Sequence, residues 1–544
     1  MKFIDFLFAV KALFPILTAI VLAAFVIKIH SYRLFDKKRK YHPVAGTVLH
    51  QLFNFHRLLE YMIDLTNKRK TYRLLSFTRS EVYTANPANI EHMLVTNFSN
   101  YGKVLFKLSI AISLKTYLNL LQGWYHHSVL EDLLGDGIFT VDGEKWRHQR
   151  KSASYQFSTK LLREFSSSVF KSSAVKLAGI VSEAAISNNI IELQDLFMKS
   201  TLDSVFKVIL GVELDTMRGT YREGTQFSIA FDEASAAIMY RYVNFLWKVQ
   251  RFLNIGSEAV LKKSLRVIDD FVYKVITSKI EQSQKPQDNS LGLKGDILSR
   301  FLELNETNPK YLKDIILSFI IAGKDTSAIT LSWFIYQLCK HPHVQEKIAK
   351  EIREATKVED SLTIDELAAK VTEESMEKMQ YLHAALTETI RLHPALPVES
   401  KYCFSDDTLP DGYSVKKGDL VSFQPYVMGR MKFLWGEDAE QFRPERWLDE
   451  NGNFMKESSF KFTAFQISIE LYNQLICYDL LTQAGPRICI GKDFAYRQMK
   501  IYSAVLLGSH GFKLADQNKL AKYKIMLTLQ IDGGLHVYAF QRNK

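Results

Sequence analysis

The segment richest in chemical information surrounds Cys489. In the sequence Ala484-Gly-Pro-Arg-Ile-Cys-Ile-Gly491, Gly485 and Arg487 precede the cysteine by four and two residues. Gly491 follows it by two. Glycines allow a tight turn in which backbone N–H groups approach the sulfur, and such groups with a nearby arginine stabilise a thiolate. A thiolate held in this way is suited to be an axial ligand of haem iron. Taken alone, the segment is equally compatible with a buried structural cysteine in a turn.

Two earlier segments place charged residues at spacings that allow a hydrogen-bonded network. Glu388 and Arg391 are three residues apart, so they share one face if this part of the chain is helical. Read alone, they are an ordinary surface pair. Arg446, within Phe442-Arg-Pro-Glu-Arg-Trp447, is a candidate to complete a Glu/Arg/Arg network with them.

A third segment combines apolar and polar residues within one predicted helix, 311–340. Residues 315–321 are nearly all apolar, and Asp325 and Thr326 follow almost at once. Burying such groups costs free energy unless they find partners. The small residues Ala322 and Gly323 leave room for a ligand, and the Thr326 hydroxyl can bond a carbonyl one turn back, which predicts a local kink and groove. The alternative is an exposed polar patch on an ordinary helix.

The segment 143–151 supplies a further pair of donors. Trp146 and Arg150 are four residues apart, so a helix points the indole N–H and the guanidinium the same way. Lys145, Arg147 and Lys151 in the same segment predict a basic surface suited to an acidic partner protein. For any one of these three residues, a merely solvated charge is an equally good interpretation.

The elements that must position these residues are mainly helical. Their hydrophobic periodicity predicts helices near 144–180, 190–212, 258–284, 311–340, 343–356 and 374–392. Turn-rich, strand-like sequence lies near 70–85, 400–425 and 522–542. The sequence after residue 45 contains neither an internal repeat nor a Gly/Pro/Ser-rich linker. We therefore predict one large domain that is mainly α with small β-sheets.

The composition excludes several classes of protein. The chain has 544 residues, of which 47% are hydrophobic, too many for a disordered protein. Lys and Arg number 70 against 59 Asp and Glu, a formal charge of +11. Such a charge suits an anionic membrane surface or an acidic partner, and nucleic acid is the other usual interpretation. The four cysteines are widely and irregularly spaced, so neither a disulfide framework nor a thiolate zinc site is predicted.

The N-terminal residues predict a membrane anchor. Residues 12–27 carry no charge and are mostly aliphatic, a length that is marginal for a spanning helix. Because small residues typical of a cleavage site do not follow, we expect the segment to be retained. Lys37-Lys-Arg-Lys40 comes next and favours the cytoplasmic side, although a nuclear-localisation lookalike or a solvated patch is the alternative. We predict an anchor at 1–30, a basic linker at 31–45 and a cytosolic domain at 46–544.

The order of these motifs resembles cytochrome P450 monooxygenases. The chain presents Glu388-Thr-Ile-Arg391, then Pro444-Glu-Arg-Trp447, then the Cys489 loop, with Ala322-Gly-Lys-Asp-Thr-Ser327 in the long apolar helix. The resemblance runs from about residue 40 to the C-terminus. More locally, four segments resemble the plant long-chain fatty-acid ω-hydroxylases: Tyr41-His-Pro-Val44, Lys401-Tyr-Cys-Phe404, Lys461-Phe-Thr-Ala-Phe465 and Asp532-Gly-Gly-Leu-His536.

The resemblance implies a cytochrome P450 fold for residues 46–544 and a role for each motif. The cofactor would be haem b, with Cys489 as the axial ligand of its iron. Trp146 and Arg150 would contact a haem propionate, with Arg487 as a second candidate, and Phe465, Gly485 and Gly491 would pack against the haem. Asp325 and Thr326 would relay protons to bound oxygen. Glu388, Arg391 and Arg446 would form a structural network.

The same resemblance implies an activity and partners. We expect hydroxylation of an apolar substrate, in particular a long-chain fatty acid at or near the ω position. O2 and electrons from NADPH-cytochrome P450 reductase would be consumed, and nucleic acid is not an expected partner. The enzyme would be anchored once in the endoplasmic reticulum membrane, with its catalytic domain in the cytosol.

Two mostly apolar segments interrupt the family pattern. Residues 467–483 separate Phe465-Gln466 from Ala484, and residues 104–122 separate Asn100-Tyr-Gly-Lys103 from Gly123. Surface loops are normally polar, so we hypothesise that both segments are translated introns. Val104 fits a GT donor site, and Gln122 and Gln483 fit CAG acceptor sites, but Ile467 does not fit a donor site.

The interruptions leave alternatives to the monooxygenase interpretation. One is a non-catalytic, membrane-anchored haem-fold protein, or the product of a mis-spliced gene, because the Cys loop is broken. Another is a rearranging enzyme of the same fold that needs neither reductase nor O2. Asp325 and Thr326 argue against the latter, since it would have no use for a proton relay.

Overall fold

The computed structural model describes residues 44–75, 80–102, 128–141, 143–242, 244, 246–283, 295–357, 363–465, 489–525 and 528–542. The predicted anchor at 1–30, nearly all of the basic linker and both interrupting segments lie outside these residues. Gly485 and Arg487 also lie outside them. The predictions that concern those parts of the chain are therefore untested by the fold.

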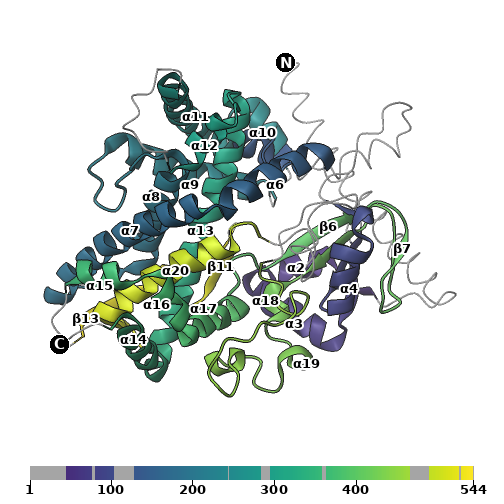
Figure 1. Cartoon of the computed structure of the whole chain (residues 1–544). Coiled ribbons are helices and arrows are strands. Elements are labelled where there is room, and N and C mark those ends of the chain that lie inside the picture. Colours follow the sequence, from purple (N-terminus) through teal and green to yellow (C-terminus); the bar gives the residue numbers. More distant parts are fainter. Residues whose placement is uncertain are drawn as a thin grey trace, which may run out of the picture.

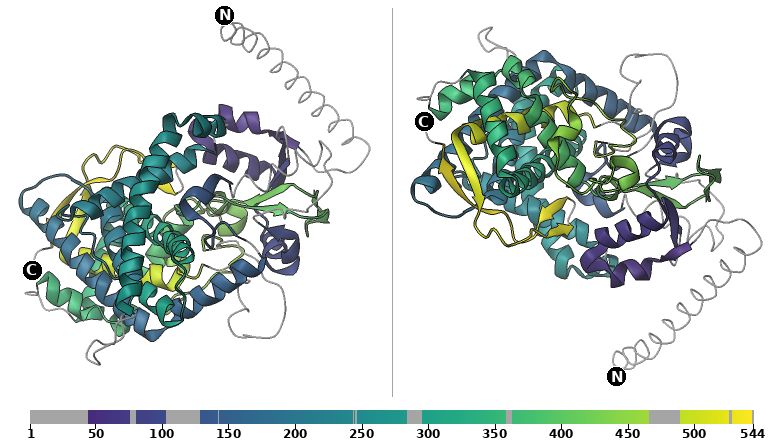
Figure 2. Two further views of the ribbon diagram at one scale, coloured as in Figure 1. Left: turned by 90° about the horizontal axis from the view of Figure 1, so that it is seen from above. Right: turned by 90° about the horizontal axis from the view of Figure 1, so that it is seen from below.

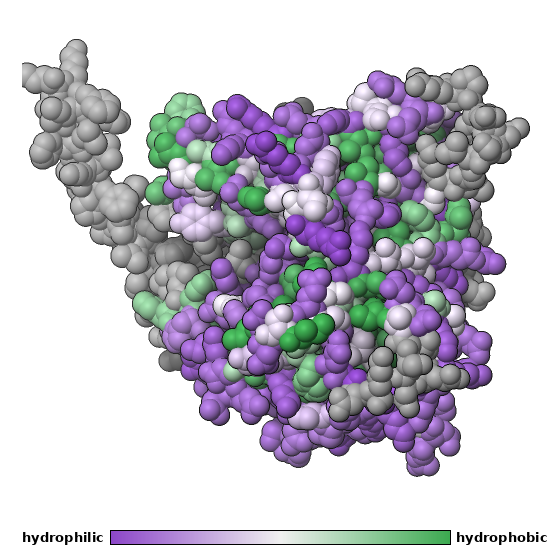
Figure 3. All heavy atoms as spheres, turned by 90° about the vertical axis from the view of Figure 1, so that its left-hand side faces the viewer, coloured by the Kyte–Doolittle hydropathy of each residue, from purple (hydrophilic) through white to green (hydrophobic). Residues whose placement is uncertain are grey.

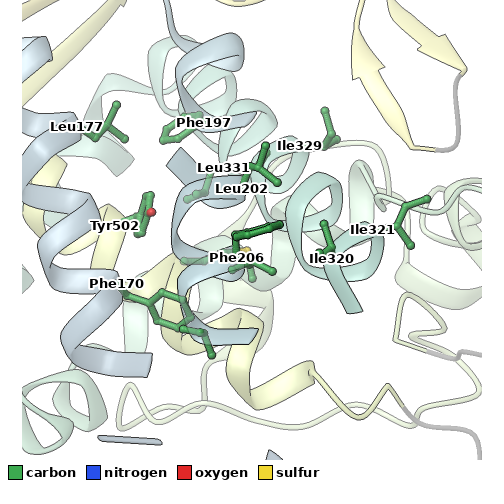
Figure 4. Close-up of a cluster of buried hydrophobic side chains, with 14 of the residues drawn as sticks. Phe170, Leu177, Phe197, Leu202, Phe206, Ile320, Ile321, Ile329, Leu331 and Tyr502 are labelled. Atoms are coloured by element: carbon green, nitrogen blue, oxygen red, sulfur yellow. The ribbon is translucent and has the colours of Figure 1, made fainter. Parts of the chain in front are cut away.

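The centre of the molecule is the long helix α13, Pro309–Lys340. Most of its side chains are buried, and it packs against α8, Leu193–Leu210. Helix α8 in turn contacts α7, Lys160–Ile186, which also packs on α20, Lys492–Ser509. Figure 4 shows the apolar side chains that these helices direct toward one another. This apolar core fixes the position of the Asp325–Thr326 segment on α13.

Further helices surround this core. They are α6 (Gly143–Ser158), α9 (Arg222–Tyr240), α10 (Trp247–Leu253), α11 (Gly256–Ser283), α12 (Ile297–Glu303), α14 (Pro342–Thr356), α15 (Ile364–Lys370), α16 (Glu373–Lys378) and α17 (Gln380–Leu392). Shorter helices near the largest sheet are α2 (Val48–Phe53), α3 (Leu58–Lys68), α4 (Pro87–Glu91), α18 (Pro425–Met428) and α19 (Lys432–Trp435).

The largest sheet in the described residues has six strands in the order β1-β2-β3-β9-β6-β4. These strands are β1 (Val44–Thr47), β2 (Thr71–Leu75), β3 (Ser80–Thr84), β9 (Leu420–Phe423), β6 (Glu399–Cys403) and β4 (Tyr101–Gly102). Strand β2 pairs antiparallel with β3, and β3 pairs parallel with β9. The sheet therefore joins two regions that are more than 300 residues apart in the chain.

Three smaller sheets complete the described strands. One has the order β10-β13-β5, from His510–Leu514, His536–Gln541 and Ile191–Glu192. The other two pair β11 (Tyr523–Ile525) with β12 (Leu529–Ile531), and β7 (Asp407–Thr408) with β8 (Ser414–Val415). In Figures 1 and 2, the six-stranded sheet and its short helices lie to one side of the helical part. The predicted fold class, mainly α with small β-sheets, is confirmed.

Some predicted boundaries were wrong. The predicted helix 144–180 is two helices, because Thr159 adopts an extended conformation and its side chain caps α7 by accepting from the Leu162 amide. The predicted helix 374–392 is likewise divided at Met379 into α16 and α17. Helices α9 and α20 were not predicted. Among the described helices, α13 is long and apolar enough to cross a bilayer, but it is a mostly buried core helix.

Candidate active site

Cys489 lies just before the start of α20, where two distant parts of the chain meet. Its backbone N–H donates to the carbonyl oxygen of Phe465, with an N···O distance of 2.9 Å. The residues that flank the undescribed segment 466–488 are therefore in direct contact. A Cβ atom added at Gly491 would lie 3.9 Å from the Cys489 sulfur, so the backbone of this turn passes close to the thiol.

The surroundings of the Cys489 sulfur combine burial with positive charge. Burial raises the pKa of the thiol, whereas the Gly491 N–H, Arg150 and Lys492 each act to lower it. Burial also lowers the pKa of Arg150 to about 10, and the charge of Cys489 opposes that decrease. The sequence-predicted Arg150 and Cys489 are thus electrostatic neighbours. Without a further cation at the sulfur, the burial cost prevails and the thiol form is favoured.

Trp146 occupies the same region and has an unusual environment. Its side chain is fully buried and packs with Ile138, Val141 and Ile490, the residue after the cysteine. Its indole Nε1 has no hydrogen-bond partner within the part of the chain that the structure describes. A buried donor without an acceptor is rare in folded proteins, and here it lies one helical turn from Arg150. The predicted pair therefore includes a donor for which the described residues provide no acceptor.

Aromatic contacts link the cysteine turn to the helical core. The Phe465 ring lies 5.3 Å from Tyr496 and 6.2 Å from Phe462, measured between ring centroids. Phe157 of α6 makes edge contacts with Phe319 of α13, at 5.3 Å, and with Phe494 of α20, at 5.7 Å. Helices α6, α13 and α20 therefore converge next to Cys489.

The predicted Glu/Arg/Arg network is present. Glu388 and Arg391 on α17 form a buried two-point ion pair with distances of 2.7 and 2.8 Å. Arg446 Nε lies 3.4 Å from Glu388 Oε1, and Trp447 Nε1 donates to Glu388 Oε2 at 2.9 Å. Arg391 also donates to the carbonyl oxygens of Gly429 and Ala439. The network joins α17 to the chain that leads toward Phe465.

Helix α13 carries the predicted polar segment, and the predicted hydroxyl–carbonyl bond is present in it. The Thr326 hydroxyl donates to the Ala322 carbonyl one turn back, at 2.6 Å. On the neighbouring turn, a Cβ at Gly323 would meet both methyl groups of Val205 at 3.1 Å, so this glycine allows α8 to approach closely. Asp325 is buried and its carboxylate contacts Lys324 at 3.1 Å.

Sequence reasoning missed Lys324 and its second partner. Lys324 is buried on α13 and also forms an ion pair with Asp232 of α9. The sequence contained one signal, a lysine inside an otherwise apolar helix and next to the predicted proton relay. The identity of Asp232 could not be found from local sequence, because 92 residues separate the pair.

Comparison with known proteins identifies the family. The family model for cytochrome P450 matches residues 37–467, and that match ends where the predicted interruption begins. Cytochrome P450 704C1 of Pinus taeda is 44% identical over 98% of each chain. Cytochrome P450 704B1 of Arabidopsis thaliana is 40% identical over 92% of this chain and 94% of its own. Cytochrome P450 94A1 of Vicia sativa is 32% identical over 93% and 90%, respectively.

These relatives are plant proteins of nearly the same extent, and the family model covers well over half of the chain. The predicted resemblance to plant cytochromes P450 is confirmed. Proteins of this family bind haem b through a cysteine thiolate and use O2 with electrons from a redox partner. The chain therefore belongs to the cytochrome P450 family of monooxygenases.

Proposed function

We propose that this cytochrome P450 hydroxylates a long-chain fatty acid at or near its ω carbon, with O2 and electrons from NADPH-cytochrome P450 reductase. The observation that carries the haem-dependent part of this proposal is the turn at Cys489, whose backbone is bonded to Phe465 and whose thiol lies close enough to Arg150 for their charges to interact. The fatty-acid substrate rests on the four local segments that resemble plant ω-hydroxylases, and the apolar core of the protein agrees with a lipid substrate.

The residues present fit a haem. Burial favours the neutral thiol at Cys489, and iron at the sulfur would supply the missing cation and hold it as a thiolate. Trp146 Nε1 is a buried donor without an acceptor among the described residues, and a carboxylate of the cofactor would satisfy it. Trp146 and Arg150 would hold a propionate, with Arg487 as a further candidate. Phe465, Gly485 and Gly491 would shape the turn around the sulfur.

When bound, the haem supplies the activation of O2 for insertion into a C–H bond. The protein's own residues supply position and protons. The Thr326 hydroxyl is held by the Ala322 carbonyl, and its neighbour Asp325 is the buried acid that would deliver protons to it. The apolar side chains of α13 and α8 would keep bulk water away from the substrate chain.

We also propose attachment to the endoplasmic reticulum membrane through residues 1–30, with the catalytic domain on the cytosolic side. A group of exposed apolar side chains on and around α10 supports contact with a lipid surface: Tyr240, Tyr242, Leu246, Val249, Phe252, Leu253 and Ile255. Phe252 is 88% exposed. By contrast, the face shown in Figure 3 is mainly hydrophilic, with hydrophobic residues in small separate groups.

The decisive experiment is a carbon-monoxide difference spectrum of the reduced, membrane-bound protein, followed by turnover of a fatty-acid panel with added reductase. We expect the thiolate–CO band, its loss in Cys489→Ser and its retention in Cys403→Ser, a control at a cysteine elsewhere in the fold. If the band were absent from the unmodified protein, the non-catalytic alternative would stand. Turnover without NADPH would instead favour the rearranging enzyme.

A further inference from the structure

The central helix contains a buried cation that the proposed chemistry does not use. The Lys324 side chain is 2% exposed, and its ammonium lies between the carboxylates of Asp325 and Asp232. Asp325 is the next residue on α13, at 3.1 Å, whereas Asp232 belongs to α9. The Asp232 side chain is 57% exposed. The three residues thus form an unbroken series of charged contacts from solvent to the buried acid beside Thr326.

Burial of this lysine requires a compensating interaction. Transfer of an ammonium group out of water is strongly unfavourable unless partners replace the lost hydration. Burial alone would lower the pKa of Lys324, but Asp325 and Asp232 outweigh that effect and the pKa is raised. Lys324 therefore stays charged, and its charge in turn compensates the buried Asp325. The ammonium also lies 5.9 Å from the Phe231 ring, which adds a weak favourable contact.

The backbone on either side holds this arrangement in place. The Thr201 hydroxyl of α8 donates to the Lys324 carbonyl at 3.0 Å, and the Thr326 hydroxyl donates to the Ala322 carbonyl at 2.6 Å. Both bonds fix the turn of α13 that carries Asp325. The side chain of Lys324 leaves that turn toward α9, so the route to solvent runs between α9 and α13.

We propose that Lys324 and Asp232 are positioning residues that keep Asp325 ionised and connected to solvent at α9, where the protons for hydroxylation enter. The inference rests on the proposed monooxygenase function. Each hydroxylation joins RH, O2, two electrons and two protons to give ROH and water, so each turnover must import two protons. Asp232 holds the Lys324 ammonium on the solvent side and Lys324 holds Asp325, so protons from water at α9 reach Asp325 while Lys324 keeps its own charge.

The first test reads the carboxyl group directly and does not depend on turnover. Removing the lysine charge leaves Asp325 buried without a cation, which favours its protonated form. Infrared difference spectra at neutral pH should show the C=O stretch of a protonated carboxyl group in Lys324→Met. The band should be absent from the unmodified protein, from Lys324→Arg and from Lys324→Met/Asp325→Asn. If Lys324→Met lacks the band, Lys324 does not hold Asp325 ionised and the proposal fails.

The second test follows the protons during turnover. In Asp232→Asn, we expect the hydroxylation rate to fall by about tenfold, less than the roughly 10²-fold or greater loss typical of removing a group that itself transfers the proton. The solvent deuterium isotope effect should rise, and more of the NADPH electrons should appear as hydrogen peroxide. Asp232→Glu should restore both. Glu223→Gln is the matched control, because Glu223 is also an ion-paired acid on α9, with Lys274 as its partner.

The two tests separate the possible failures. If the unmodified protein hydroxylates none of the fatty acids, the proposed function fails, while the infrared result still decides the role of Lys324. If Asp232→Asn and Glu223→Gln behave alike in rate, isotope effect and peroxide yield, the Asp232–Lys324 pair only fastens α9 to α13 and the proton route is refuted.

Discussion

At the scale of single residues, the indole N–H of Trp146 makes it possible to distinguish a packing role of this side chain from a role in binding. The Trp146 side chain is fully buried, and its indole N–H has no acceptor among the residues that the structure describes. Such a donor costs about 1–3 kcal/mol, which a bound carboxylate would recover. A ligand carboxylate beside Trp146 would therefore contribute a measurable amount of stability, which substitution of this one residue can reveal.

Trp146→Phe tests that argument. In the haem-free protein, the smaller side chain destabilises the fold, whereas removal of the unpaired N–H stabilises it. We therefore expect the free energy of unfolding to change by about 1 kcal/mol or less. In the haem-bound protein, we expect faster release of haem to an acceptor such as apomyoglobin. Equal destabilisation of both forms, measured by urea denaturation, would show that Trp146 is only a packing residue.

His383 gives the protein a specific sensitivity to acid. The centroid of its ring lies 4.4 Å from that of Tyr496 and 4.3 Å from that of Phe454. Its pKa is lowered from 6.5 to about 3, mainly by burial and to a lesser extent by the charges of nearby lysines. The folded protein therefore holds this imidazole neutral where the unfolded chain takes up a proton. Its contribution to stability is present above pH 6.5 and is lost as the pH falls toward 3.

The expected loss from His383 at pH 5 is about 2 kcal/mol relative to pH 7. Urea denaturation of His383→Gln should show a shallower decline of unfolding free energy between pH 6.5 and 5 than the unmodified protein. His343→Gln, at an exposed position, is the control and should retain the original decline. Identical slopes in the two variants would contradict the assignment.

At the scale of elements, the sequence pattern predicted α8, α11, α13 and α14 close to their observed bounds, but it missed α9 and α20 and the points where two predicted helices break. The α13 pattern was visible because its long apolar run ends in a polar segment. The break at Thr159 depends on one side-chain cap, which a periodicity over 37 residues conceals. The motif residues Glu388, Arg391 and Arg446 were found because they lie in short signatures. Asp232 was missed because its role depends on an ion pair with a residue of α13 that is distant in the sequence.

The Glu388 network also dictates a glycine that sequence pattern does not explain. A Cβ at Gly429 would lie 2.1 Å from the carbonyl oxygen of Arg391 and 3.2 Å from that of Pro425, both backbone atoms that cannot move freely. The Gly429 carbonyl itself accepts from the Arg391 guanidinium. The close approach of α18 to the end of α17 therefore requires a residue without a side chain.

Gly429→Ala is expected to destabilise the protein by about 1–3 kcal/mol or more, because it forces the backbone apart. Gly179→Ala is the matched control. Gly179 lies within α7, and a Cβ added there would have no atom within 4 Å, so this change should stabilise by roughly 0.5–1 kcal/mol. Urea midpoints of the two variants give both values. A Gly429→Ala protein as stable as the unmodified one would show that α17 and α18 can separate without cost.

At the scale of the whole molecule, the contact between Phe465 and Cys489 bears on whether the fold needs residues 467–483. Phe465 and Cys489 are hydrogen-bonded at 2.9 Å, so the folded protein requires the intervening chain only to return to its starting point. Six residues would then suffice where 23 stand now. Shortening a closed loop in this ratio recovers about 1 kcal/mol of chain entropy.

Deleting residues 467–483 should therefore leave a folded protein that is more stable by about 1 kcal/mol and that binds at least as much haem per chain. Urea denaturation and the carbon-monoxide spectrum measure the two quantities. A variant in which a Gly/Ser-rich segment of the same length replaces residues 467–483 separates loop length from apolar character. If that variant matches the deletion in haem content and the original does not, the apolar composition is the obstacle. If the deletion alone loses haem, the segment is a working part of the enzyme and the intron hypothesis fails, because a translated intron would have no reason to support the cysteine turn.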